Sequence, residues 1–126
     1  MSKTMCILVV DDFATMRKII KNILNQLEYK NIVDAEDGTA ALDILNKRPV
    51  DFIISDWNMP KMTGIDFLRA VRGDKKFAHL PFIMVTAEGL QENIIEAVQA
   101  GVSQYVVKPF SPATLEEKIN KCLGAG

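Results

Sequence analysis

The sequence predicts a single α/β domain built on one parallel sheet of five strands, with helices on both faces. Short apolar runs alternate five times with segments whose apolar residues recur at helical spacing. Strict alternation of this kind is typical of parallel strands joined by right-handed crossover helices. The 126 residues suit one hydrophobic core and contain no linker-like or low-complexity stretch, so we treat residues 1–126 as one domain.

Bulk composition argues against several function classes. Hydrophobic residues make up 48% of the chain and charged residues 25%, as in ordinary globular proteins. With 15 basic and 16 acidic residues the net charge is -1, which indicates neither a nucleic-acid partner nor a membrane surface. The longest apolar run, residues 5–10, is too short to span a bilayer, and the two aspartates after it argue against a signal peptide. We expect a monomeric cytoplasmic protein.

The first strand and the first helix have the clearest patterns. Residues 5–10 form an unbroken apolar run that predicts a buried strand, and Asp11 and Asp12 follow it directly. The next segment predicts a helix with one apolar stripe, made of Met16, Ile19, Ile20, Ile23, Leu24 and Leu27. Arg17, Lys18 and Lys21 lie off this stripe, and we interpret them as a solvated basic face.

The next three elements lead to Asp56. Residues 31–35 predict a short strand, and the turn signal at 37–39 precedes a helix over 40–47. Residues 52–54 are β-branched or aromatic without a polar interruption, which is typical of a strand buried on both faces. Asp56 therefore lies at the C-terminal end of a central strand.

The second half of the chain repeats the alternation. A third helix begins at Thr63 or Gly64 and ends near residue 73, and a fourth strand over 82–85 ends on Thr86. A helix over 92–100 ends at Gly101, where a glycine suits the left-handed C′ position.

The last strand and helix complete the fold. The fifth strand covers residues 104–107 and ends on Lys108. In the last helix Ser111 is the expected N-cap and Pro112 occupies the first turn. Its apolar stripe is formed by Leu115, Ile119, Cys122 and Leu123.

Polar side chains stand at four of the five predicted strand ends. Asp11 and Asp12 follow the first strand, Asp56 ends the third, Thr86 ends the fourth and Lys108 follows the fifth. Because the carboxyl ends of parallel strands lie along one edge, where ligands bind in open α/β sheets, these side chains should meet. Each pair of carboxylates about 4 Å apart costs roughly 4 kcal/mol at an effective dielectric near 20, more than one lysine offsets.

A hard divalent cation would relieve this repulsion. Oxygen ligands without nearby histidine or cysteine select such an ion, and Mg²⁺ is the usual one beside phosphate. We expect Asp12 and Asp56 to bind Mg²⁺ directly and Asp11 to act through water, with a backbone carbonyl just after Asp56, that of Asn58, as a further ligand.

The same residues suit phosphoryl transfer. An ionised aspartate is a known covalent phosphoryl acceptor, and the reaction requires positioning and charge neutralisation. We therefore predict that Asp56 accepts the phosphoryl group. Lys108 would neutralise the phosphoryl oxygens, and the Thr86 hydroxyl would donate a hydrogen bond to one of them.

Four stretches of the chain resemble the signatures of response-regulator receiver domains. They are Val9-Val10-Asp11-Asp12, Asp56-Trp57-Asn58-Met59-Pro60, Val85-Thr86-Ala87 and Val107-Lys108-Pro109-Phe110, in the order and spacing of that family. Residues 12–17, 56–64 and 97–101 and Tyr105 are similar to chemotaxis members of the family. The resemblance implies a flavodoxin-like, doubly wound sheet of order 2-1-3-4-5 and phosphotransfer from a chemotaxis-type histidine kinase to Asp56.

The resemblance also implies an output surface. In the family, Thr86 and Tyr105 shift together and alter the face formed by the fourth helix, the fifth strand and the fifth helix. On this chain that face includes Leu90, Gln91, Ile94, Val98 and Lys118. Ile94 and Val98 belong either to an exposed apolar strip beside Tyr105 or to the core, and Ile95 also needs burial. By the same resemblance, Asn58 and Glu88 tune the rate at which the phosphate is lost.

The fourth helix departs from the pattern of motor-binding relatives. Those proteins carry a lysine pair soon after the Thr-Ala-Glu turn, whereas this chain continues Gly89-Leu90-Gln91. Glu96 stands where a small residue is expected. The sequence therefore does not decide whether the target is the flagellar motor switch or another partner. An alternative is that the protein has no target and serves as a phosphate sink. A dedicated phosphatase is a further possible partner.

Two other classes fit less well. A phosphatase of the haloacid dehalogenase type also uses Asp, Mg²⁺, Thr and Lys, but it needs a second aspartate two residues after the nucleophile of the first strand. Here Phe13 follows Asp11 at that spacing. A flavin-binding flavodoxin-like module would need a hydroxyl- and glycine-rich loop where Asp11 and Asp12 would repel a phosphate. His79, the only histidine, is next to no strand end, so we expect no role for it as ligand or phosphoryl acceptor.

Overall fold

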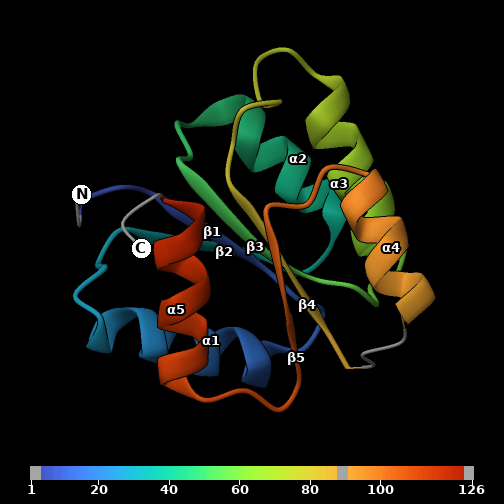
Figure 1. Cartoon of the computed structure of the whole chain (residues 1–126). Helices are drawn as coiled ribbons and strands as arrows, with labels where there is room; N and C mark the ends of the chain where they lie inside the picture. Colours follow the sequence, from blue (N-terminus) through green and yellow to red (C-terminus); the bar gives the residue numbers. More distant parts are fainter. Residues whose placement is uncertain (1–3, 88–90, 124–126) are drawn as a thin grey trace.

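The computed structural model describes residues 4–87 and 91–123, and its strands form one parallel sheet (Figure 1). The strands are β1 (Ile7–Val10), β2 (Ile32–Ala35), β3 (Phe52–Asp56), β4 (Phe82–Thr86) and β5 (Gln104–Val107). Their order in the sheet is β2-β1-β3-β4-β5, so the predicted fold class and strand order are confirmed. β1 and β3 are hydrogen-bonded neighbours at the centre, which places the ends of these two strands next to each other.

Within the described residues, five helices cover the two faces of the sheet. They are α1 (Ala14–Gln26), α2 (Gly38–Lys47), α3 (Gly64–Gly73), α4 (Gln91–Gln99) and α5 (Pro112–Cys122). α1 and α5 lie on one face, and α2, α3 and α4 lie on the other (Figure 1). This arrangement explains why the central strands carry apolar side chains at successive positions, since both of their faces are covered.

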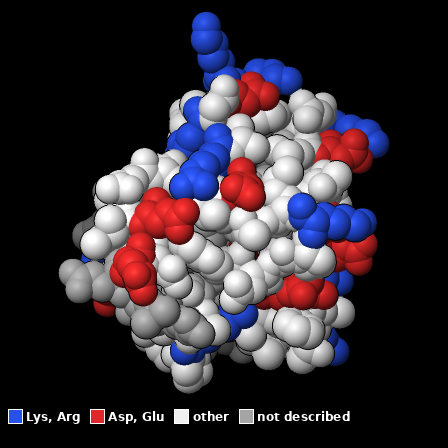
Figure 2. Space-filling model, turned by 90° about the vertical axis from the view of Figure 1, so that its right-hand side faces the viewer, with Lys and Arg blue, Asp and Glu red and all other residues white. Residues whose placement is uncertain are grey.

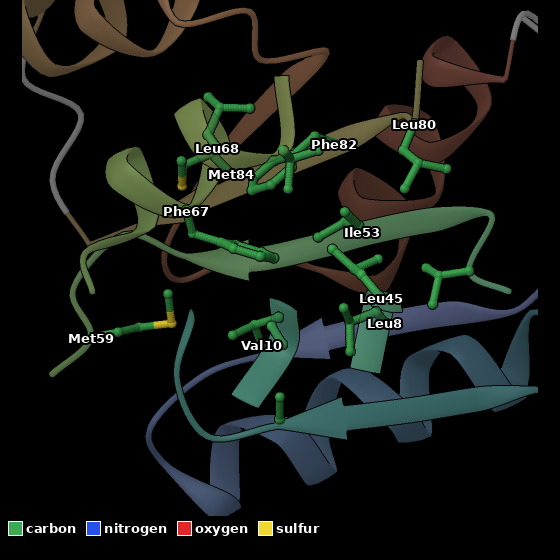
Figure 3. Packing of buried hydrophobic residues seen from close by; sticks show 14 of the residues in the cluster. Leu8, Val10, Leu45, Ile53, Met59, Phe67, Leu68, Leu80, Phe82 and Met84 are labelled. Carbon is green, nitrogen blue, oxygen red and sulfur yellow. The ribbon is translucent and has the colours of Figure 1, made fainter. Parts of the chain in front are cut away.

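Alternate residues of each strand supply the two halves of the core. One half packs Leu8 and Ile53 against apolar residues of α2 and α3, as Figure 3 shows for Leu45, Phe67 and Leu68. The Phe67 and Phe82 rings lie 5.5 Å apart in a tilted arrangement. The other half packs the strand residues Ile7, Val9 and Ile83 against Ile20, Leu24, Leu115 and Ile119 of α1 and α5.

Local capping signals define where several helices begin. Asp37 accepts a hydrogen bond from the Ala40 amide, so α2 begins at Gly38 and not, as expected, at residue 40. The predicted turn over 37–39 is thus the N-cap and first turn of the helix. Ser111 caps α5 in the predicted way, by accepting from the Thr114 amide. After the C-terminal end of α4, Gly101 has a φ of 95°, which is the left-handed conformation expected for a glycine at this position.

Two isoleucines expected to face the core are exposed. Ile19 was placed on the buried stripe of α1, but 45% of its surface is exposed, because α1 contacts the sheet through Ile20, Ile23 and Leu24. Ile19 instead lines a surface pocket next to Lys108. Ile95 is 47% exposed, since a small residue, Ala97, is the one that α4 buries against the core. A single helical stripe cannot bury adjacent positions equally.

The charged side chains on the face of α3 and α4 are mixed in sign. Figure 2 views the side that lies at the right of Figure 1 and shows acidic and basic groups interspersed. One ion pair there joins the two helices, with Arg69 Nη2 3.0 Å from Glu96 Oε2. Glu96, which departs from the family pattern, is therefore bound to α3. Over the described part of the chain, no helix combines the length and the apolar character needed to cross a bilayer.

Candidate functional site

Three aspartates meet at the carboxyl edge of the sheet. Asp11 and Asp12 leave β1, and Asp56 ends β3, the strand beside it. One carboxylate oxygen from each of the three lies within 4.8 Å of the others. Asp11 is fully buried and Asp56 is 5% exposed, whereas Asp12 is partly exposed. We call these three residues the acidic cluster.

Lys108 provides a cation to the acidic cluster. Its Nζ donates to Asp56 Oδ1 at 2.9 Å and lies 3.7 Å from Asp11 Oδ2. The loop after β5 is held in place because the Lys108 amide donates to the Thr86 carbonyl at 2.7 Å. The Lys108 ammonium therefore contacts two of the three carboxylates of the cluster, and these side chains lie together as the order of the strand ends predicted.

The charges of the acidic cluster are only partly compensated. Burial raises the pKa of Asp11 above its usual value, and the Phe13 amide, which donates to Asp11 Oδ1 at 2.9 Å, opposes this shift. Burial also raises the pKa of Asp56, against the hydrogen bond from Lys108. Among the residues that the structure describes, Asp11 Oδ2 and Asp12 Oδ1 are buried without a hydrogen-bond partner. Such oxygens are costly to leave unpaired, and an all-oxygen set of this kind fits a hard divalent cation.

The loop from β3 to α3 passes close to the acidic cluster and depends on Gly64. The Gly64 amide donates to the Trp57 carbonyl at 2.7 Å. A Cβ at this position would collide with the Asp56 carbonyl oxygen and lie 2.8 Å from the Trp57 Cα. Only glycine therefore allows α3 to begin against the strand that carries Asp56.

A model of the response regulator receiver domain matches residues 7–120. The chain belongs to this family. It is 59% identical over 117 residues to chemotaxis protein CheY of Pseudomonas aeruginosa, covering 93% of this chain and 94% of that protein. It is 54% identical over 121 residues to chemotaxis protein CheY-3 of Vibrio cholerae, covering 96% of this chain and 93% of the relative.

Solved receiver structures have the same fold. CheY4 of Vibrio cholerae matches with a TM-score of 0.88 at 35% identity, covering 94% of this chain and 98% of that one. The receiver domain of a sensor histidine kinase of Pseudomonas aeruginosa matches with a TM-score of 0.86 at 28% identity, covering 96% and 98%. That structure is described with a magnesium ion coordinated in the active site cleft. CheY is itself a standard example of the strand order 2-1-3-4-5.

The receiver fold brings most of the predicted site residues together. The acidic cluster and Lys108 are in contact, and Thr86 is buried at the end of β4, beside the strand that carries Asp56. Asn58 is exposed on the loop two residues beyond Asp56. Glu88 and Leu90 lie outside the described residues, and so does the side chain of Gln91.

The predicted output surface of this receiver domain is partly apolar and exposed. The sequence left open whether Ile94 and Val98 lie on the surface or in the core. Val98 is 59% exposed and so lies on the surface, whereas Ile94 is partly buried. Tyr105 is partly buried on β5, with Lys118 Nζ 5.5 Å from the centre of its ring. Ile94 and Val98 belong to α4, Tyr105 to β5 and Lys118 to α5, and the role of these residues in output stays a prediction.

The interpretation of Arg17 as part of a solvated basic face is wrong. Its side chain was expected on a solvated basic face, but only 18% of it is exposed. Its Nη1 donates to the Asp11 carbonyl at 2.7 Å, and its Nε donates to Asp34 Oδ2 at 2.9 Å. No local signal in the sequence reveals these bonds, because one acceptor is a backbone oxygen and the other lies on β2.

Proposed function

We propose that this receiver domain accepts a phosphoryl group on Asp56 in an Mg²⁺-dependent reaction and so acts as a response regulator of chemotaxis type. The observation that carries the proposal is the buried carboxylate of Asp56 beside two further carboxylates and the Lys108 ammonium. Buried carboxylates that are only partly neutralised by a lysine are a candidate site for binding a divalent cation and accepting a phosphoryl group. The likeness to two CheY proteins supports the chemotaxis assignment.

The acidic cluster would hold Mg²⁺. Asp12 and Asp56 would bind the ion directly, Asp11 would act through water, and the Asn58 carbonyl would complete the protein ligands. Asp11 Oδ2 and Asp12 Oδ1, which are buried and find no hydrogen-bond partner in the described part of the chain, support this set. The ion would neutralise the carboxylates and the incoming phosphoryl oxygens.

The protein residues have separate roles in the transfer. A carboxylate oxygen of Asp56 attacks the phosphorus of a phosphohistidine, forming an acyl phosphate while the bond between phosphorus and the imidazole nitrogen breaks. Lys108, which already contacts Asp56, would pair with a phosphoryl oxygen. The Thr86 hydroxyl would donate to another. The protein would thus promote only its own phosphorylation and dephosphorylation, the latter tuned by Asn58 and Glu88.

Phosphotransfer from a histidine kinase tests this function. Mixed with a phosphorylated histidine kinase of chemotaxis type and Mg²⁺, the protein should acquire one phosphoryl group, measured by intact mass. With excess EDTA in place of Mg²⁺, transfer should stop, because the ionised cluster would repel the anionic donor. Equal transfer under both conditions would refute the metal-dependent mechanism.

The partners follow from the same proposal. A histidine kinase would supply the phosphoryl group to a monomeric protein in the cytoplasm, without contact to nucleic acid or membrane. The target would be the flagellar motor switch or another protein that binds the face of α4, β5 and α5. The sequence Gly89-Leu90-Gln91 lacks the expected lysine pair and supports a phosphate sink as the second candidate, with or without a dedicated phosphatase.

Binding to an acidic peptide of the flagellar switch distinguishes these targets. We expect the phosphorylated protein to bind such a peptide weakly, because charge complementarity promotes encounter and specificity. Replacing Leu90 and Gln91 by Lys should strengthen binding, and more so at low salt. Fluorescence anisotropy of a labelled peptide measures both effects. Tight, salt-insensitive binding by the unchanged phosphorylated protein would contradict this expectation.

A further inference from the structure

We propose that Arg17 is a positioning residue, which fixes the backbone between Asp11 and Asp12 and thereby sets the affinity of the acidic cluster for divalent metal. The inference rests on the proposed metal site and adds to it a residue that binds neither the metal nor the phosphoryl group. Three observations carry it: the bond from Arg17 to the Asp11 carbonyl, the hydrogen bonds that hold the Asp11 amide and Oδ1, and the anchoring of the largely buried Arg17 by Asp34.

The first observation concerns the backbone at the end of β1. Arg17 Nη1 donates to the carbonyl oxygen of Asp11 at 2.7 Å. That carbonyl belongs to the peptide group joining Asp11 to Asp12, so its direction determines where the Asp12 side chain leaves the backbone. The bond therefore acts on two members of the acidic cluster at once, without touching either carboxylate.

The second observation is that two other polar groups of Asp11, its amide and its Oδ1, are also held by hydrogen bonds. Its amide donates to the Ala35 carbonyl at 3.2 Å, and its Oδ1 accepts from the Phe13 amide. The bond from Arg17 is the third hydrogen bond that holds Asp11. The other two involve the backbone of Ala35 and Phe13, whereas this one comes from a side chain. Loss of that bond would leave the carbonyl free to rotate with the next peptide.

The third observation is that Arg17 is itself held in place. Its Nε donates to Asp34 Oδ2 at 2.9 Å, and Lys21 Nζ lies 3.7 Å from the other oxygen of the same carboxylate. With 18% of its side chain exposed, Arg17 is more enclosed than Lys21, at 39%. The donors of a guanidinium are held in fixed directions within one plane, so Nε and Nη1 can bond to two acceptors at once in a geometry that an ammonium cannot reproduce. Asp34 on β2 thus orients Arg17, and Arg17 orients the peptide after Asp11.

If only its charge mattered, Arg17 would be expected to weaken metal binding, not to support it. Arg17 is a cation near a site for another cation, so removing its charge should strengthen Mg²⁺ binding if charge were its only effect. If Arg17 acts by positioning, its removal should weaken binding, as the loss of outer-shell partners of metal ligands does by about 10–100-fold. The sign of the change therefore separates the two roles.

The test is a Mg²⁺ titration of folded protein followed by the fluorescence of Trp57, which is adjacent to Asp56. We expect the dissociation constant to rise about tenfold in Arg17→Ala, the lower end of that range. Arg17→Lys should show most of this loss although it keeps the charge. Lys21→Ala is the matched control, because Lys21 contacts Asp34 but is not bonded to Asp11, and its affinity should stay within about twofold of wild type.

Each outcome decides the proposal. Unchanged or tighter binding in Arg17→Ala would overturn it, and so would wild-type affinity in Arg17→Lys. If Arg17→Ala does not fold, Arg17→Lys decides by itself, since it retains the charge and the aliphatic stem. A wild-type protein that gives no fluorescence or thermal response to Mg²⁺ would refute the metal site together with this inference, which separates that failure from a failure of Arg17 alone.

Discussion

Replacing Asp56 by Asn is expected to abolish phosphorylation of this protein. The substitution preserves the size and shape of a side chain that is 5% exposed, so the fold should persist. It removes the carboxylate that would attack phosphorus, and a neutral amide is not a phosphoryl acceptor of this kind. Incubation with acetyl phosphate and Mg²⁺, followed by intact-mass measurement, should show one added phosphoryl group on the wild type and none on Asp56→Asn.

Thr86→Ala provides the control for this experiment. Thr86 would donate a hydrogen bond to the phosphoryl group but would not form a bond to phosphorus, so the variant should still be phosphorylated, at a lower rate. Acyl phosphates are destroyed by hydroxylamine, which should remove the added mass from both proteins. A phosphoryl group retained by Asp56→Asn would show that another residue is the acceptor.

Mg²⁺ is expected to raise the melting temperature of the wild type and to leave that of Asp12→Ala unchanged. The ion would relieve the repulsion within the acidic cluster, in which the Lys108 ammonium contacts two of the three carboxylates. At a concentration one hundred times the dissociation constant, binding to the folded state alone adds about 2.7 kcal/mol to the free energy of unfolding. Differential scanning fluorimetry over a range of Mg²⁺ concentrations measures the effect.

The Mg²⁺ effect should grow with pH. Burial raises the pKa of Asp11 and Asp56 in the metal-free folded protein. A carboxyl with a raised folded pKa stabilises the protein below its unfolded pKa, and this contribution is lost as the pH rises through the folded value. Protons also compete with the metal for the same oxygens. The rise in melting temperature should therefore be larger near about pH 7 than near about pH 5.

Asp12→Ala tests the assigned ligands. If Mg²⁺ raised the melting temperature of Asp12→Ala as much as that of the wild type, the assignment of the ligands would be wrong.

Glu96, which departs from the family pattern, forms an ion pair with Arg69 that links α4 to α3. From sequence, Glu96 was only a charged residue where a small one was expected. In the structure it joins α4 to α3 at 3.0 Å, on a partly exposed surface where such a pair contributes about 0–1 kcal/mol. Its partner lies 27 residues away in the chain, so its position in the sequence gives no indication of the pair.

The sequence by itself determined the fold class, the strand order through a family resemblance, and the placement of the acidic cluster beside Lys108. Apolar runs of strand length and helical stripes are local patterns, and caps such as Ser111 are local as well. Once five parallel strands are predicted, their carboxyl ends must share one edge, so Asp11, Asp56 and Lys108 could be expected to meet there. No knowledge of side-chain packing was needed for that step.

Only the tertiary structure decided which side chains near this edge are buried and what they contact. Ile19 and Ile95 are as apolar as their neighbours in the sequence, but α1 and α4 bury other residues against the core and leave these two exposed. Arg17 was expected in solvent, yet it bonds to Asp34 and to a backbone oxygen of Asp11. Every residue has a backbone carbonyl, so the sequence cannot mark the one that accepts such a bond. That choice depends on how α1 packs beside β1 and β2.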